Sequence, residues 1–131
     1  MTIIENLKKQ VELLKKLIRL HQLLLAIKKN EPEPDKEEIW EYIRIKTLEY
    51  NINYGLAFEV AKCESGFKPF AINFNRNGSY DRGLYQINDR WHPEMSDEDC
   101  FNYKKSIEFF CQAVKAGHLN WWNASRTCWS K

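Results

Sequence analysis

A proline-rich acidic segment, Glu31-Pro32-Glu33-Pro34, divides this chain into two parts of different character. Proline lacks a backbone N–H donor and disfavours helix in the residue before it, so this segment ends a helix and runs extended. We therefore predict a helix over residues 1–30, a linker over 31–35 and a folded domain over 36–131. A chain of 131 residues is long enough for one such domain with a buried core.

The N-terminal part carries the repeat of an amphipathic coiled-coil helix. Between residues 3 and 27, apolar side chains recur at spacings of three and four, interrupted only by His21. The members of this seam are Ile4, Leu7, Val11, Leu14, Ile18 and Leu25. A second apolar row lies beside the seam and consists of Leu13, Leu17, Leu20, Leu24 and Ile27. The combined face is wider than a simple dimer buries, so it needs a larger partner surface.

Two partners would cover this face: further copies of the helix in a trimer or larger bundle, or the chain's own folded domain. We predict self-association through residues 3–27, with His21 as a polar residue that sets register. Residues 1–30 carry seven Lys/Arg against two Glu. Charges on a helix are most often its solvated face, so we expect no nucleic-acid partner.

No segment of the chain predicts membrane insertion or export. The longest apolar run of the helix, Leu23–Ile27, is far too short to span a bilayer, and lysines recur where the apolar core of a signal peptide would lie. We therefore expect neither a transmembrane segment nor a visible export signal.

Two further helices are predicted after the linker. Asp35 followed by Glu38 indicates a capping box that opens a helix to about Tyr50, with Ile39, Trp40, Ile43 and Leu48 directed inward. A second helix runs from Leu56 to about Glu64 and ends at Gly66, where glycine supplies a left-handed stop.

The next segment indicates a small β-hairpin. Asn77-Gly78 is a tight-turn signal, and Asp81 stands on the returning strand. In the run Gly83-Leu84-Tyr85-Gln86-Ile87-Asn88, Leu84 and Ile87 fill the core while Gln86 and Asn88 point amides into a cleft. The fold class is therefore α+β, mainly α, with a long amphipathic helix in front. Glu64 at a helix end would face the hairpin that bears Asp81.

This pair of carboxyl groups suits the cleavage of a glycosidic bond. The reaction needs one carboxylic acid that is still protonated near neutral pH, and a second group that stabilises the cationic sugar centre. Glu64 lies near aromatic residues that raise a pKa by desolvation, whereas Asp81 is surrounded by Asn77, Ser79 and Asn88. Asp81 has an alternative role as a turn cap, and Glu64 as an ordinary exposed residue.

Three motifs together resemble the lysozyme superfamily: Glu64-Ser65-Gly66-Phe67, Asn77-Gly78-Ser79-Tyr80-Asp81 and the run from Gly83 to Asn88. They are similar both to chicken-type lysozymes, the type case for two carboxyl groups held in different environments, and to bacterial lytic transglycosylases. The resemblance implies Glu64 as the general acid and Asp81 as nucleophile or electrostatic stabiliser. It implies substrate contacts for the following residues: Ser65, Asn73, Asn75, Gln86, Asn88, Trp91 and Trp121. Of Trp121 and Trp122, only one can point inward. His92 and His118 are expected on the surface.

The resemblance is dense over some thirty residues and leaves the branch open. The late Tyr-Asn signature of transglycosylases is replaced by Trp121-Trp122-Asn123, which favours hydrolysis, while chicken-type lysozymes have eight cysteines and this chain has four. Three pairings are open from the sequence, as is the alternative of buried free thiols. Alongside the resemblance we prefer Cys63 with Cys128, and Cys100 with Cys111.

The resemblance implies a muramidase that cleaves the β-1,4 bond between N-acetylmuramic acid and N-acetylglucosamine in peptidoglycan. Peptidoglycan strands are then the substrate, the location is extracytoplasmic, and neither metal nor cofactor is expected. The alternative function is a non-catalytic wall-binding or adaptor module with a lysozyme fold.

Overall fold

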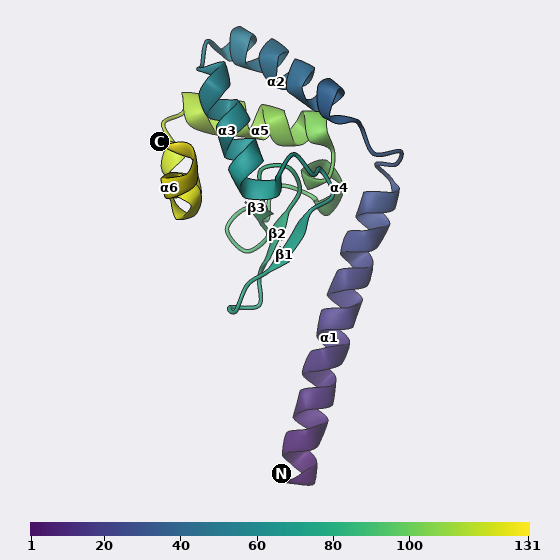
Figure 1. Cartoon of the computed structure of the whole chain (residues 1–131). Helices are drawn as coiled ribbons and strands as arrows, with labels where there is room; N and C mark the ends of the chain where they lie inside the picture. Colours follow the sequence, from purple (N-terminus) through teal and green to yellow (C-terminus); the bar gives the residue numbers. More distant parts are fainter.

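The computed structural model describes residues 1–131 and places one long helix beside a body of shorter helices and a small sheet (Figure 1). The long helix is α1 (Ile3–Lys28). The body contains α2 (Lys36–Tyr50), α3 (Tyr54–Ser65), α4 (Asp97–Cys100), α5 (Tyr103–Lys115), the 3₁₀ helix η1 (Leu119–Ser125) and α6 (Arg126–Trp129). Its strands are β1 (Ile72–Phe74), β2 (Tyr80–Arg82) and β3 (Ile87–Asn88). The predicted class, mainly α with a small sheet, is confirmed.

Helix α1 packs on the body only through its last turns, against α4 and the sheet (Figure 1). Leu23 is fully buried and Ala26 nearly so, in a cluster with Tyr80 and Phe101. Leu23 belongs to neither predicted apolar row. All eleven large aliphatic residues from Ile3 to Leu25 other than Leu23 are at least 38% exposed. The body therefore does not cover the coiled-coil seam. No helix of the chain has the length and apolar character needed to cross a membrane.

Helix α2 begins at the predicted cap, where the Asp35 side chain accepts a hydrogen bond from the Glu38 amide. It ends at Tyr50, followed by Asn51 in the left-handed conformation. Ile39 and Ile43 are fully buried, as predicted, but the inward orientation of Leu48 is wrong because its side chain is 82% exposed. Thr47 takes the inward position instead, since its hydroxyl donates to the Ile43 carbonyl and so loses no hydrogen bond on burial.

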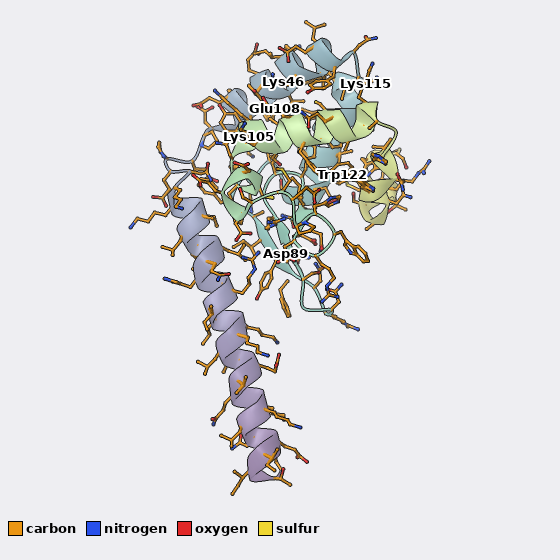
Figure 2. The ribbon with its side chains drawn as sticks, turned by 180° about the vertical axis from the view of Figure 1, so that it is seen from behind. Lys46, Asp89, Lys105, Glu108, Lys115 and Trp122 are labelled. Carbon is orange, nitrogen blue, oxygen red and sulfur yellow. A yellow bond between two sulfur atoms is a disulfide. The ribbon has the colours of Figure 1, made fainter.

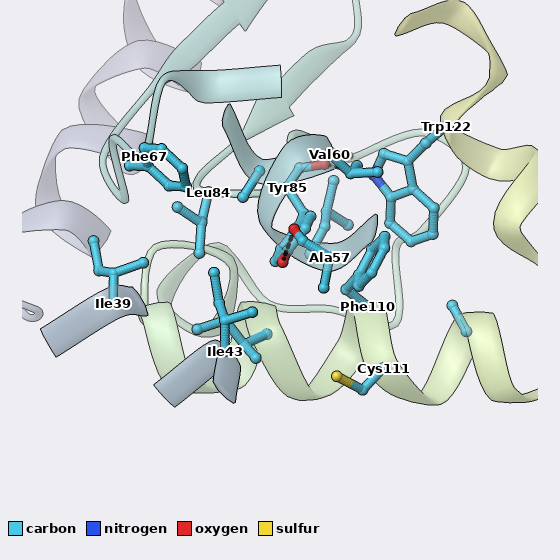
Figure 3. Close-up of a cluster of buried hydrophobic side chains, with 14 of the residues drawn as sticks. Ile39, Ile43, Ala57, Val60, Phe67, Leu84, Tyr85, Phe110, Cys111 and Trp122 are labelled. Carbon is cyan, nitrogen blue, oxygen red and sulfur yellow. Dashed lines mark hydrogen bonds between the residues drawn. The ribbon is translucent and has the colours of Figure 1, made fainter. Parts of the chain in front are cut away.

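Helix α3 starts at Tyr54, two residues earlier than predicted, and ends as predicted at the left-handed Gly66. It packs with α2 and α5 around a core of buried apolar residues, part of which is drawn in Figure 3. Tyr85 crosses this core, stacks on Phe110 at 4.3 Å and donates its hydroxyl to the Ala57 carbonyl. A surface ion pair between Lys46 and Glu108 also joins α2 to α5 (Figure 2).

The strands form one antiparallel sheet in the order β1-β2-β3. The predicted turn at Asn77-Gly78 joins β1 to β2, and a third short strand extends the hairpin. In this register Asp81 on the central strand lies opposite Asn73 on one side and Asn88 on the other. The sheet thus places two amide side chains beside one carboxylate.

One of the two preferred disulfides is present. Cys63 is bonded to Cys128, which joins α3 to α6. The Cys100–Cys111 pairing is wrong, because both residues are free and buried. Cys100 ends α4 and Cys111 lies within α5. Both thiols belong to the same buried cluster, where they fill the core as small apolar groups.

Candidate active site

A cleft of about 740 Å³ is lined by side chains from α3, the sheet and its loops, α5 and η1. One wall comes from the end of α3, the β1–β2 turn, β2 and β3; the other comes from the loop after β3, α5 and η1. Glu64 and Asp81 both line it. A volume in the range of 300–1,000 Å³ is typical of sites that enclose small molecules or parts of polymers.

Glu64 stands in the last turn of α3, where the helix end points its carboxyl group into the cleft. Partial burial raises the pKa of Glu64 above its ordinary value, a hydrogen bond with Ser125 partly offsets this, and the charge of Asp81 raises it further. Desolvation is the largest cause because it penalises the charged form of a carboxyl group. Glu64 therefore retains its proton to higher pH than an exposed glutamate.

Asp81 lies on the central strand in a polar setting. Its carboxylate accepts hydrogen bonds from the side-chain amides of Asn88 at 2.9 Å and Asn73 at 3.3 Å. Hydrogen bonds donated to a carboxylate stabilise its charged form. The two carboxyl groups of the cleft thus have different surroundings, one apolar and one amide-rich.

Asn88 connects several parts of this wall. Its amide nitrogen donates to Asp81 and to the Ser79 hydroxyl, both at 2.9 Å. Its oxygen accepts from the backbone amides of Arg90 and Trp91 at 2.9 and 3.1 Å. One side chain therefore orients the Asp81 carboxylate and also fixes the loop that carries Trp91, whose ring is 71% exposed at the cleft.

The opposite wall is aromatic. Trp122 is buried and donates its indole N–H to the Tyr85 carbonyl, whereas Trp121 is 43% exposed and lines the cleft. One tryptophan points inward and the other outward, as predicted. The expectation that His92 is a surface residue is wrong, because its ring lies in the cleft 4.6 Å from that of Trp121 with only 14% of its side chain exposed. His118 is exposed and stacks on Trp121.

Most of the residues singled out in the sequence converge on this cleft. Those that line it are Glu64, Asn75, Asp81, Gln86, Asn88, Trp91 and Trp121. Two do not line it. Ser65 donates its hydroxyl to the Leu84 carbonyl and connects α3 to the sheet segment, while Asn73 reaches the site through its hydrogen bonds to Asp81 and Asn75. The amide nitrogen of Gln86 is held by the Ala71 and Gly83 carbonyls.

The sequence did not single out Arg76, His92 or Phe109 as cleft residues. Arg76 could have been found, since it follows Asn75 in the same turn. Phe109 has no local signal, because it reaches the cleft from α5 and only the packing of that helix places it there.

A helical body with a small antiparallel sheet, and a cleft that holds one partly buried and one amide-bound carboxyl group, defines the lysozyme-like class of folds. The family described as "Lysozyme like domain" matches residues 51–125, more than half of the chain. The chain belongs to this family, and the resemblance seen in the sequence is confirmed.

Individual relatives come from bacteria and from a bird. The chain is 42% identical to protein IpgF of Shigella sonnei over 65 residues, which are 50% of this chain and 42% of the relative. It is 37% identical to the invasion protein IagB of Salmonella typhimurium strain SL1344 over 68 residues, 52% of this chain and 42% of the relative. It is 61% identical to lysozyme C of Dromaius novaehollandiae over 59 residues, 45% of this chain and 39% of the relative. The matches thus span about two fifths of each relative's length.

Proposed function

We propose that this protein is a muramidase that cleaves the β-1,4 bond between N-acetylmuramic acid and N-acetylglucosamine in peptidoglycan. One observation carries the proposal: Glu64 and Asp81 line the same cleft, with burial raising the pKa of Glu64 and amide donors surrounding Asp81. This is the division of roles that glycosidic cleavage requires. Membership of a lysozyme-like family supports it.

Glu64 acts in the proposed reaction as the general acid and then as the general base. It donates its proton to the leaving oxygen as the bond breaks, and then removes a proton from the group that attacks the sugar. Asp81 faces the developing positive charge as a nucleophile or as an electrostatic stabiliser. Asn75, Gln86, Asn88, Trp91 and Trp121 hold the sugar rings, with exposed indole rings as stacking surfaces.

Either water or a hydroxyl group of the sugar can complete the reaction. Attack by water leaves a reducing muramic end, whereas internal attack leaves a 1,6-anhydro end. The relatives include both a lysozyme C and bacterial proteins of other names. The proposal therefore covers both products, and the mass of the released fragments distinguishes them.

The test of this function is the substitution Glu64→Gln on purified peptidoglycan. Gln has nearly the same shape and cannot donate a proton to the leaving oxygen, so we expect release of fragments to fall by at least about a hundredfold, in line with loss of general acid catalysis. Glu59→Gln is the matched control, because Glu59 lies on the same helix and outside the cleft. Fragments are identified by mass spectrometry, and thermal unfolding verifies the fold of each variant.

Two results would contradict the proposal. Full activity of Glu64→Gln would remove Glu64 from the reaction. Binding of glycan without any turnover by the wild-type chain would instead support a non-catalytic wall-binding or adaptor module.

The proposal assigns the parts of the chain as follows. Residues 36–131 form the catalytic domain, residues 31–35 the linker and residues 1–30 an assembly helix that associates with other copies through residues 3–27. The substrate and the disulfide Cys63–Cys128 support an extracytoplasmic location, since disulfides persist in oxidising compartments.

A further inference from the structure

Arg19 on α1 forms ion pairs with two carboxylates of the body, which lie 70 and 78 residues away in sequence. Its guanidinium donates to Asp97 through Nη1 at 2.5 Å and Nη2 at 2.8 Å, a two-pronged contact. It donates to Asp89 through Nη2 at 3.0 Å and Nε at 3.3 Å. The three side chains are only 18–26% exposed, so solvent screens this cluster less than an ordinary surface ion pair.

Asp89 connects this cluster to the sheet (labelled in Figure 2). Its second carboxylate oxygen accepts from the Tyr80 amide at 2.9 Å, and its own amide donates to the Tyr80 carbonyl at 2.9 Å. Tyr80 directly precedes Asp81, and Asp89 directly follows Asn88. Arg19 therefore binds Asp89, which is the neighbour of Asn88 in the chain and is hydrogen-bonded to Tyr80, the neighbour of Asp81.

Asp97 connects the same cluster to Arg82. The Arg82 guanidinium is buried, with 2% of its side chain exposed, and donates to Asp97 at 2.9 Å. It also donates to the carbonyls of Ile87 and Met95 at 3.1 and 3.0 Å. The hydrogen bond from Arg19, followed by that from Arg82, lowers the pKa of Asp97 against the effect of its burial. Arg19 and Arg82 thus bind the same Asp97 carboxylate, and Arg82 lies in β2 and donates to β3.

We propose that Arg19 is a positioning residue for the reaction, through which helix α1 holds the strands that carry Asp81 and Asn88. This inference rests on the proposed muramidase function for its catalytic readout. The family match begins at residue 51, so α1 lies outside it. Helix α1 then supports the active site in addition to its role in assembly, and a displacement of α1 would displace Asp81 and Asn88.

The test compares Arg19→Met and Arg19→Lys with wild type in the full chain. Met keeps an apolar stem of similar length and removes the guanidinium group. We expect kcat on soluble peptidoglycan fragments to fall roughly tenfold with KM nearly unchanged, because small misplacements of reacting groups act on the chemical step. Lys keeps the charge but cannot bridge both carboxylates, so it gives an intermediate kcat. Hydrogen exchange at the Tyr80 and Asp89 amides should quicken in the same order.

Lys15→Met is the matched control, because Lys15 lies on the same helix and contacts only Glu12. It should alter neither kcat nor exchange in the sheet. A residue that merely attached α1 would, when changed to Met, speed exchange in α1 alone. Unchanged kcat in Arg19→Met, or unchanged exchange at the two sheet amides, would overturn the proposal. If wild-type protein proves inactive, the muramidase function fails while the exchange measurement still decides whether Arg19 holds the sheet.

Discussion

Glu64 and Asp81 differ because of where the chain places them. Glu64 extends from the end of a helix into a space walled by aromatic rings, while Asp81 lies between two asparagines on the central strand. Removal of water destabilises a carboxylate that has no charged or amide partner to replace it, and amide donors do the opposite. The same chemical group thus has two different environments in one cleft.

The pH dependence of activity follows from the raised pKa of Glu64. Activity should fall as pH rises through this pKa, because the acid must be protonated, so the alkaline limb should lie above the range of an ordinary glutamate. Asp81→Asn removes one of the causes that raise the pKa of Glu64. We expect the alkaline limb of the residual activity to move to lower pH in this variant, measured as kcat/KM against pH.

Glu37→Gln is a suitable control for this shift, since Glu37 is an exposed glutamate in the first turn of α2, outside the cleft. Its profile should match that of wild type. An alkaline limb in Asp81→Asn at the same pH or higher would contradict the electrostatic coupling of the two carboxyl groups.

The sequence predicted most of the cleft because its key residues lie in one stretch, from Glu64 to Trp91. A helix stop at Gly66 and a turn at Asn77-Gly78 are local signals, and together they turn Asp81 back toward Glu64. His92 and Phe109 were missed because their place in the cleft depends on contacts between distant segments. Arg19 was missed for the same reason, since its partners Asp89 and Asp97 are fixed only by the docking of α1.

At the scale of elements, β2 and α4 approach so closely that only glycine fits between them. Gly83 follows β2 with φ +79°, and a Cβ at this position would collide with the carbonyl oxygen of Cys100 at the end of α4. The oxygen belongs to the backbone and the position of a Cβ is fixed by the backbone, so no side-chain rotation relieves the contact. The close approach seats the sheet against the helix that also supplies Asp97.

Gly83→Ala should therefore destabilise the protein by more than about 3 kcal/mol, because it combines a left-handed backbone with a backbone collision. Gly78→Ala is the matched control. Gly78 has φ +88° and open space around it, so only the backbone strain of about 1 kcal/mol applies there. Urea unfolding of the two variants measures the difference, and equal losses of stability would show that the approach of Gly83 to Cys100 imposes no constraint.

Helix ends were well predicted and burial within helices less so. Asp35 and Gly66 are cap signals with a local mechanism, and both act where expected. Leu48 and Thr47 are neighbours whose order of burial depends on the exact rotation of α2 against α5. The pairing of Cys100 with Cys111 failed because a count of cysteines does not distinguish thiols that form a disulfide from thiols that pack in the core as small apolar groups.

At the scale of the molecule, α1 faces the body with its polar side. At 100° per residue, Arg19, Leu23 and Ala26 fall within a sector of about 60°, and the two apolar rows lie to either side of this sector and away from it. Ile27, at the end of one row, packs partly against the body. The other ten row members and Ile3 are 38–80% exposed and present on the order of 1,000 Å² of surface. A standard protein interface buries roughly 800 Å² on each partner, so this face is large enough for a stable assembly.

We propose a second copy of the chain as the partner of this face. Ile4, Val11 and Ile18 alternate with Leu7 and Leu14, which is the β-branched and leucine pattern of coiled-coil cores. The body docks on α1 through Leu23 and Ala26, which belong to neither apolar row. Under the proposed function, linking several clefts in one assembly would raise their apparent affinity for a glycan network.

Self-association is predicted to depend on the exposed rows and on nothing else in α1. Sedimentation or light scattering of wild-type protein should give at least twice the chain mass of 15.7 kDa. Leu7→Gln combined with Leu14→Gln places amides in the seam and should return the mass to that of one chain, while the body keeps its thermal unfolding transition.

Lys9→Gln combined with Glu12→Gln changes polar positions of the same helix and should leave the assembly intact. A wild-type protein that is monomeric at tens of micromolar, or that binds anionic vesicles as a monomer, would contradict the assembly and assign the apolar face to another partner.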